Sequence, residues 1–108
     1  MQSLSPNLPP DTQREMLRRM VTIRRFEERA SAEYLAGKIY GVVHCYIGEE
    51  AVAVGVCSAL DRGDRIISTH RGHGHCIAKG ADLNRMMAEL YGRQTAPSTG
   101  RARAAARL

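Results

Sequence analysis

The chain has 108 residues, enough for one domain at most. It holds one Phe and no Trp, so its core must be modest and built from Ala, Val, Ile, Leu and Met. No apolar run approaches the roughly 20 residues that a membrane span needs, and no secretory signal is visible. We therefore expect a cytoplasmic protein without a membrane partner, whose three widely spaced cysteines are buried, reduced thiols.

The net charge of +5 raises the question of nucleic-acid binding. Residues 1–95 hold thirteen Lys and Arg and all eleven acidic residues, so the body of the chain is nearly neutral. The rest of the charge lies in the tail, at Arg101, Arg103 and Arg107. A small basic nucleic-acid-binding protein remains the alternative function, although the chain lacks interleaved aromatic residues for base stacking. We expect no nucleic-acid partner.

Residues 1–11 are rich in Ser, Pro and Asn and are predicted to be a flexible leader, the first of three segments. Thr12 and Glu15 form a capping-box pattern that predicts a helix from residue 12 to about Ala36, ended by Gly37. Its apolar row recurs at spacings of three and four and consists of Met16, Met20, Ile23, Phe26 or the neighbouring Glu27, Ala30 and Tyr34. Arginines alternate with Glu27, Glu28 and Glu33, which indicates a solvated face or a subunit contact.

The centre of the chain is predicted to contain two extended segments. Ile39–Ile47 is rich in aromatic and β-branched residues, and a helix follows from Glu49 and Glu50, whose carboxylates suit a helix start. Asp61–Asp64 is predicted to be a turn and Arg65–Thr69 a short strand.

Two short helices are predicted after these segments. One runs through Cys76 to Ala78 and ends at Gly80, and the last begins at Asp82 and stops at Gly92. Two strands at most leave much apolar surface without a sheet to cover. The chain therefore looks like part of a larger α/β domain, mostly helical and with an incomplete sheet.

The stretch STHRGHGH, residues 68–75, carries three imidazoles and a guanidinium interleaved with glycines. It follows the apolar pair Ile66 and Ile67, where a short strand is predicted to end. An α/β fold places ligand-binding groups at the carboxyl ends of its strands, and glycines let backbone amides approach an anion. The pattern predicts an anion site, for phosphate above all, with Arg71 as the fixed charge and the histidines as hydrogen-bonding groups.

Other interpretations of these side chains stay open. His70, His73 and His75 could bind a metal, but their spacing across glycines fits zinc poorly, and a structural cluster is a further alternative. His44 lies in a β-branched run and could be a satisfied core histidine. Glu49 could serve as a general acid or base, although a carboxylate at a helix start needs no function.

Three motifs in order give a specific family resemblance. HCYIGEEA at residues 44–51, THRGHG at 69–74 and MMAELYGR at 86–93 resemble the N-terminal part of the alpha subunits of thiamine-diphosphate-dependent dehydrogenases. These are the first components of 2-oxo acid dehydrogenase complexes. The resemblance covers residues 12–95, the second segment, and implies part of a thiamine-diphosphate-binding fold. The string HRGHGHCIAKG is more similar to acetoin dehydrogenases than to pyruvate dehydrogenases, whose motif more often begins with Tyr-Arg.

The resemblance implies an enzyme subunit that acts with partners. Its relatives use thiamine diphosphate and Mg²⁺ to cleave or oxidatively decarboxylate acetoin, pyruvate or another 2-oxo acid. They pass the acyl group to the lipoyl-lysine of an acyltransferase component. The alpha subunit assembles with a beta subunit into a heterotetramer.

The resemblance also implies roles for four residues. His44 corresponds to the active-site histidine near the thiazolium ring and the substrate, and His73 lines the same entrance. His70 and Arg71 correspond to the pair that contacts the cofactor diphosphate, which agrees with the predicted anion site. No metal ligand is expected in this chain, because the Gly-Asp-Gly…Asn motif that holds Mg²⁺ lies further on in the family.

The third segment, residues 96–108, departs from the family, which continues with a GKGGSMH segment. Residues 101–106 can be written in codons that encode Gly-Lys-Gly-Gly-Ser in another frame. We therefore expect an aberrant basic tail from a frameshifted or truncated gene, and a chain that is inactive alone.

Overall fold

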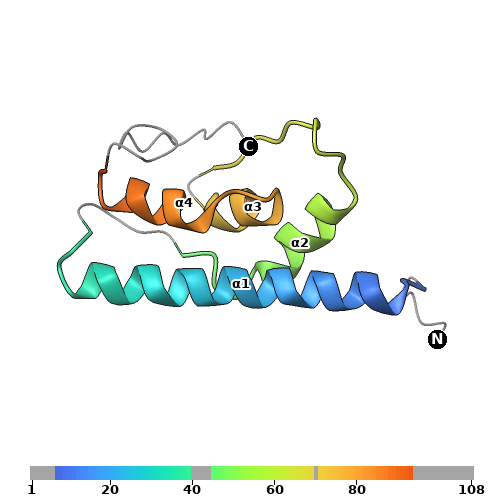
Figure 1. Cartoon of the computed structure of the whole chain (residues 1–108), viewed down its shortest axis with the longest axis horizontal. Coiled ribbons are helices and arrows are strands. Elements are labelled where there is room, and N and C mark those ends of the chain that lie inside the picture. Colours follow the sequence, from blue (N-terminus) through green and yellow to red (C-terminus); the bar gives the residue numbers. More distant parts are fainter. Residues whose placement is uncertain (1–6, 40–44, 70, 94–108) are drawn as a thin grey trace.

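The computed structural model describes residues 7–39, 45–69 and 71–93, which form four helices. Helix α1 (Pro10–Leu35) is the long axis of the molecule, and α2 (Glu50–Ser58), α3 (His73–Ala78) and α4 (Leu83–Leu90) all lie on one side of it (Figure 1). None of these helices has the length and apolarity to cross a membrane. The three shorter helices therefore pack against α1.

The predicted capping box at the start of α1 is wrong. The helix begins two residues earlier, at Pro10, with Pro9 as the N-cap residue and no side-chain cap. Proline at the first helical position has a preset φ, and its missing N–H would have had no intrahelical partner. Thr12 thus lies inside the first turn.

The C-terminal ends of α1, α3 and α4 share one geometry, and the predicted stop residues are confirmed. The glycine after each helix has a positive φ: +76° at Gly37, +92° at Gly80 and +70° at Gly92. In each case the amide of this glycine and the amide of the residue after it donate to carbonyls of the last helical turn. Gly37 N donates to Tyr34 O and Lys38 N to Glu33 O, both at 3.0 Å. Helix α4 begins as predicted, with the Asp82 carboxylate accepting from Arg85 N at 2.9 Å.

The predicted strands are not found in the part of the chain that the structure describes. Arg65–Thr69 has no regular secondary structure, and Ile67 is 94% exposed. A strand needs a neighbour to pair its N–H and C=O groups, and no described segment lies alongside to do so. Of Ile39–Ile47, residues 40–44 lie outside the described residues, while Ile47 belongs to a turn. The described part of the predicted α/β fold is thus entirely helical.

The core lies where α2 and α3 pack against the middle of α1. The apolar row of α1 is confirmed at Ile23, Phe26 and Ala30, whereas Tyr34 is 41% exposed. The remaining buried members of the cluster come from the shorter helices and the segment before α2: Tyr46, Ala53, Val54, Cys57, Ile77, Ala78 and Met86. All three cysteines are free thiols, as predicted, but the expected burial holds for Cys57 alone, since Cys45 and Cys76 are partly exposed.

The prediction of a solvated face is wrong for two of the three glutamates on which it was based. Glu27 and Glu33 are buried, and Glu28 is exposed. Glu27 lies next to Phe26 on the side that meets α3, whereas Glu33 accepts a hydrogen bond from the Tyr91 hydroxyl beyond α4. These contacts come from segments far along the chain, so helical spacing could not reveal them.

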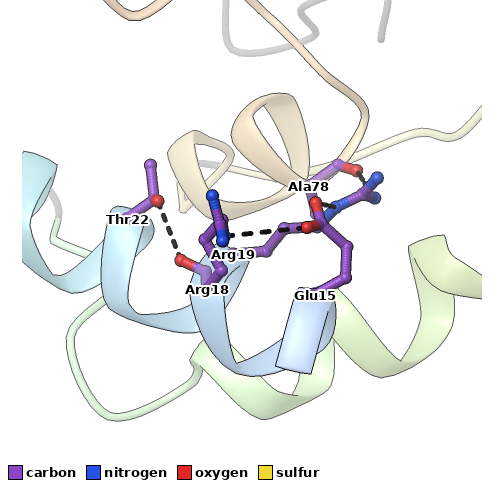
Figure 2. A network of polar contacts seen from close by, with 5 residues as sticks. All are labelled: Glu15, Arg18, Arg19, Thr22 and Ala78. Atoms are coloured by element: carbon purple, nitrogen blue, oxygen red, sulfur yellow. Dashed lines mark hydrogen bonds and ion pairs between the residues drawn. The ribbon is translucent and has the colours of Figure 1, made fainter. Parts of the chain in front are cut away.

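Arg19 ties α1 to the end of α3 (Figure 2). Its Nη1 donates to the carbonyl of Ala78 at 3.0 Å, and its Nε donates to the Glu15 carboxylate at 3.2 Å. The last carbonyls of a helix have no partner within the helix. Arg19 therefore satisfies one of them and fixes α3 on α1.

Candidate functional site

Two other segments of the chain meet on one side of α1, one with Cys45 and one with Arg71 and His73. Glu27 and Ser31 are four residues apart, so they project from the same face of the helix. Cys45 reaches this face through its thiol, which lies 2.8 Å from Ser31 Oγ. Arg71 and His73 arrive from the glycine-rich segment ahead of α3 and contact Cys45 and Glu27 respectively.

Arg71 joins the predicted anion site to the segment that carries His44. Its Nη1 donates to the carbonyl oxygen of Cys45 at 2.7 Å, and its side chain is exposed. A guanidinium has five N–H donors in a planar fork. One hydrogen bond can therefore fix its position while other N–H groups take an anion.

His73 is the first residue of α3 and is fixed by two neighbours. Its Nδ1 lies 2.7 Å from Glu27 Oε1, and its ring meets the Phe26 ring edge-on with 5.9 Å between centroids. Glu27 is fully buried, and its second oxygen, Oε2, has no hydrogen-bond partner among the described residues. The histidine side chain is 24% exposed, so the pair reaches from the core to the surface.

Glycine is required at position 74 by the ring of Tyr46. A Cβ there would stand 2.7 Å from Cγ and Cε1 of that ring, closer than real contacts allow. The same ring meets His75 edge-on at 5.1 Å. Burial raises the pKa of the Tyr46 hydroxyl, which is thus held as a neutral group. The glycines of this motif serve packing as well as backbone approach to a ligand.

A second buried carboxylate, that of Glu50, stabilises the turn ahead of α2. Glu50 is buried, forms an ion pair with Arg24 of α1, and accepts from Gly48 N at 2.9 Å. The Arg24 hydrogen bond lowers the pKa of Glu50. Glu49, the candidate general acid or base, is the N-cap residue of α2 and is exposed. The GEEA part of the motif therefore holds one structural carboxylate and one that faces solvent.

Two of the four residues assigned from the sequence can be placed. Arg71 and His73 lie on the same segment, with their contacts directed to Cys45 and to α1. His44 and His70 lie outside the described residues. Glu27 was missed as a site residue; its place beside Phe26 on the apolar row was the available signal. No group of three His, Cys, Asp or Glu side chains that could hold a metal occurs in 7–39, 45–69 and 71–93.

Comparison with known sequences identifies the family of this chain. Residues 18–107 match the profile of the family described as Dehydrogenase E1 component. The chain belongs to this family. The resemblance carried by the HCYIGEEA, THRGHG and MMAELYGR motifs is thereby confirmed.

The similar proteins are alpha subunits of two kinds. An acetoin:2,6-dichlorophenolindophenol oxidoreductase alpha subunit of Bacillus subtilis is 55% identical over 86 residues, covering 80% of this chain and 26% of the relative. Its counterpart in Cupriavidus necator is 51% identical over 94 residues, 87% of this chain and 28% of the relative. A pyruvate dehydrogenase E1 alpha subunit of Zymomonas mobilis is 51% identical over 88 residues, 81% and 25% respectively. The chain thus spans about a quarter of the length of these relatives.

Proposed function

We propose that this chain forms one wall of the cofactor and substrate site in the alpha subunit of a thiamine-diphosphate-dependent dehydrogenase. The observation that carries the proposal is the Arg71 contact. It places an exposed guanidinium against the backbone at Cys45, one residue after His44. In a chain of the Dehydrogenase E1 component family, this joins the two motifs assigned to the diphosphate end and the reacting end of the cofactor.

The described residues fit part of the cofactor. A fixed, permanently charged fork suits a diphosphate oxygen pair, and His70 is proposed to add a hydrogen bond. No three-ligand cluster that could hold Mg²⁺ occurs in the described ranges, and we assign no described residue to the metal. Thiamine diphosphate, when bound, supplies the carbanion chemistry that cleaves the bond next to the substrate carbonyl.

The residues of this chain bind and orient. Arg71 neutralises charge at the diphosphate, and its bond to the Cys45 carbonyl keeps the guanidinium in place. His44 is proposed to lie by the reacting atoms, and His73 to line the entrance with an imidazole that can hold or release a proton. Completion of the site, transfer to lipoyl-lysine of an acyltransferase component and the assembly with a beta subunit require parts beyond this chain.

Acetoin is the substrate we propose first, and pyruvate second. The HRGHGHCIAKG string supports acetoin, and the two acetoin-type relatives named above are similar to this chain over at least four fifths of its length. The test is an alpha–beta enzyme that carries this chain in its alpha subunit, assayed with acetoin and with pyruvate by 2,6-dichlorophenolindophenol reduction. Reduction that requires acetoin and thiamine diphosphate together is the expected result. If neither acetoin nor pyruvate supports reduction of the dye, the proposal is contradicted. We expect this chain alone to be inactive.

A further inference from the structure

We infer that Glu27 is a positioning residue for His73: it fixes which ring nitrogen carries the proton and which faces the site. The inference deepens the proposed function and rests on it for the role of His73. The carboxylate of Glu27 and the imidazole Nδ1 are 2.7 Å apart, across 46 positions of the sequence. No part of the family resemblance assigns a role to Glu27.

The burial of Glu27 is unfavourable in free energy if its role is purely structural. Its neighbours on the core side of α1, Ile23, Phe26 and Ala30, are all buried and apolar. A carboxylate in such surroundings loses its hydration, and an apolar side chain of similar volume would stabilise the helix packing at least as well. A requirement that comes from His73 explains why a carboxylate stands here.

The other two buried carboxylates have different partners. Glu50 pairs with Arg24, and Glu33 pairs with Arg29 at 2.9 Å and lies 3.5 Å from Lys38. Permanent cations thus compensate both. Among the described residues, the partner of Glu27 is the imidazole of His73. Of the three buried glutamates in the described ranges, Glu27 therefore differs in being paired with a histidine and not with a permanent cation.

The chemistry of the contact selects a tautomer. In the arrangement we infer, Glu27 is a carboxylate, which only accepts hydrogen bonds, and Nδ1 of His73 is the donor. In the neutral ring Nε2 then carries the lone pair and can accept a proton from a ligand. The ring becomes an imidazolium when it does so, its charge is balanced by Glu27, and the proton leaves from Nε2 again. The edge-on contact with Phe26 holds the ring plane, so rotation is opposed from two sides.

The first test is a double-variant cycle on the alpha–beta enzyme, with Glu27→Gln, His73→Ala and the pair combined. Gln keeps the size of Glu but cannot balance an imidazolium. We expect Glu27→Gln to lower kcat roughly 10- to 100-fold, by analogy with the loss of the partner that orients a metal-binding histidine. In the His73→Ala background, Glu27→Gln should not lower kcat further, because the effect of Glu27 on catalysis passes through the His73 ring. Glu28→Gln, on the exposed next position, is the matched control and should leave kcat unchanged.

The outcome that contradicts the inference is an additive cycle, in which Glu27→Gln slows the His73→Ala enzyme as much as the unaltered one. That result would make Glu27 a structural residue. Glu27→Asp is a second variant: it keeps the charge, and part of the kcat lost in Glu27→Gln should return.

The second test separates this inference from the proposed function. Nitrogen-15 NMR of histidine-labelled protein, at a pH where the ring is neutral, reports the tautomer directly. We expect the His73 proton on Nδ1 in the unaltered chain and in Glu28→Gln, and its loss from Nδ1 in Glu27→Ala. A proton on Nε2 in the unaltered chain overturns the inference. If Nδ1 is protonated but His73→Ala keeps full kcat, the pairing stands and the catalytic role proposed for His73 fails.

Discussion

The ring of Tyr46 lies directly over Gly74, in contact with the backbone of α3. Tyr46 is buried and is the third residue of the HCYIGEEA motif, while Gly74 is the last residue of the THRGHG motif. The contact therefore packs the HCYIGEEA and THRGHG motifs against each other. It makes the second glycine of HRGHG a packing requirement, independent of any bound ligand.

Replacing Gly74 by Ala should destabilise the chain by about 1–3 kcal/mol, the usual cost of overpacking a filled site. Urea unfolding followed by circular dichroism measures it. Gly55 of α2 is the matched control, because a Cβ there meets nothing within 4 Å. Gly55→Ala should be neutral or stabilise by up to about 1 kcal/mol through helix propensity. Equal effects at the two glycines would contradict the packing account.

The Glu50–Arg24 pair should make stability depend on acid pH. The pKa of Glu50 in the folded chain is lowered from 4.5, chiefly by the Arg24 hydrogen bond. The contribution of the pair is therefore full above the unfolded-state pKa and is lost as pH falls through the folded value. Arg24 is half-exposed, so we expect no more than about 1 kcal/mol.

Thermal melting of the chain and of Glu50→Gln between neutral and acid pH measures this contribution. The two proteins should differ most at neutral pH and converge in acid. A difference that grows as pH falls would show that Glu50 does not stabilise the fold as a carboxylate.

Cys76 should be alkylated far more slowly in the folded chain than in the unfolded chain. Burial raises its pKa to about 11, so at pH 8 about one thiol in a thousand is ionised, against about one in four for an unperturbed cysteine. Labelling with a maleimide, located by mass spectrometry with and without urea, tests this. We expect urea to speed labelling of Cys76 at least about 100-fold. A Cys76 that labels equally fast in both conditions contradicts its burial in this fold.

The helices and their stop signals could be predicted because they are local. Gly37, Gly80 and Gly92 end their helices through a backbone conformation that favours glycine, and Asp82 caps α4 through a residue three positions away. The strands could not be predicted in this way, since pairing depends on a distant partner. Arg65–Thr69 has the composition of a strand but no described neighbour to pair with.

The candidate site was predictable in its charges and not in its contacts. Arg71 and His73 stand out as a cation and an imidazole among glycines. The partner that Glu27 provides for His73 is invisible in the sequence, because 46 positions separate the two residues. Helical spacing gave only its place next to Phe26.

The central claim is that Arg71 serves the diphosphate end of the cofactor and His44 the reacting end. The measurement is titration of thiamine diphosphate with Mg²⁺ into the alpha–beta enzyme, with kcat determined for the same variants. Arg71→Ala should weaken cofactor binding by roughly 2–4 kcal/mol, or about 30- to 1,000-fold in Kd, because a charge-assisted contact is lost. His70→Tyr, the residue that the resemblance gives to pyruvate-type enzymes, should be nearly neutral. His44→Ala should lower kcat and leave Kd largely intact. Wild-type cofactor affinity in Arg71→Ala, or lost affinity with unchanged kcat in His44→Ala, would contradict the account.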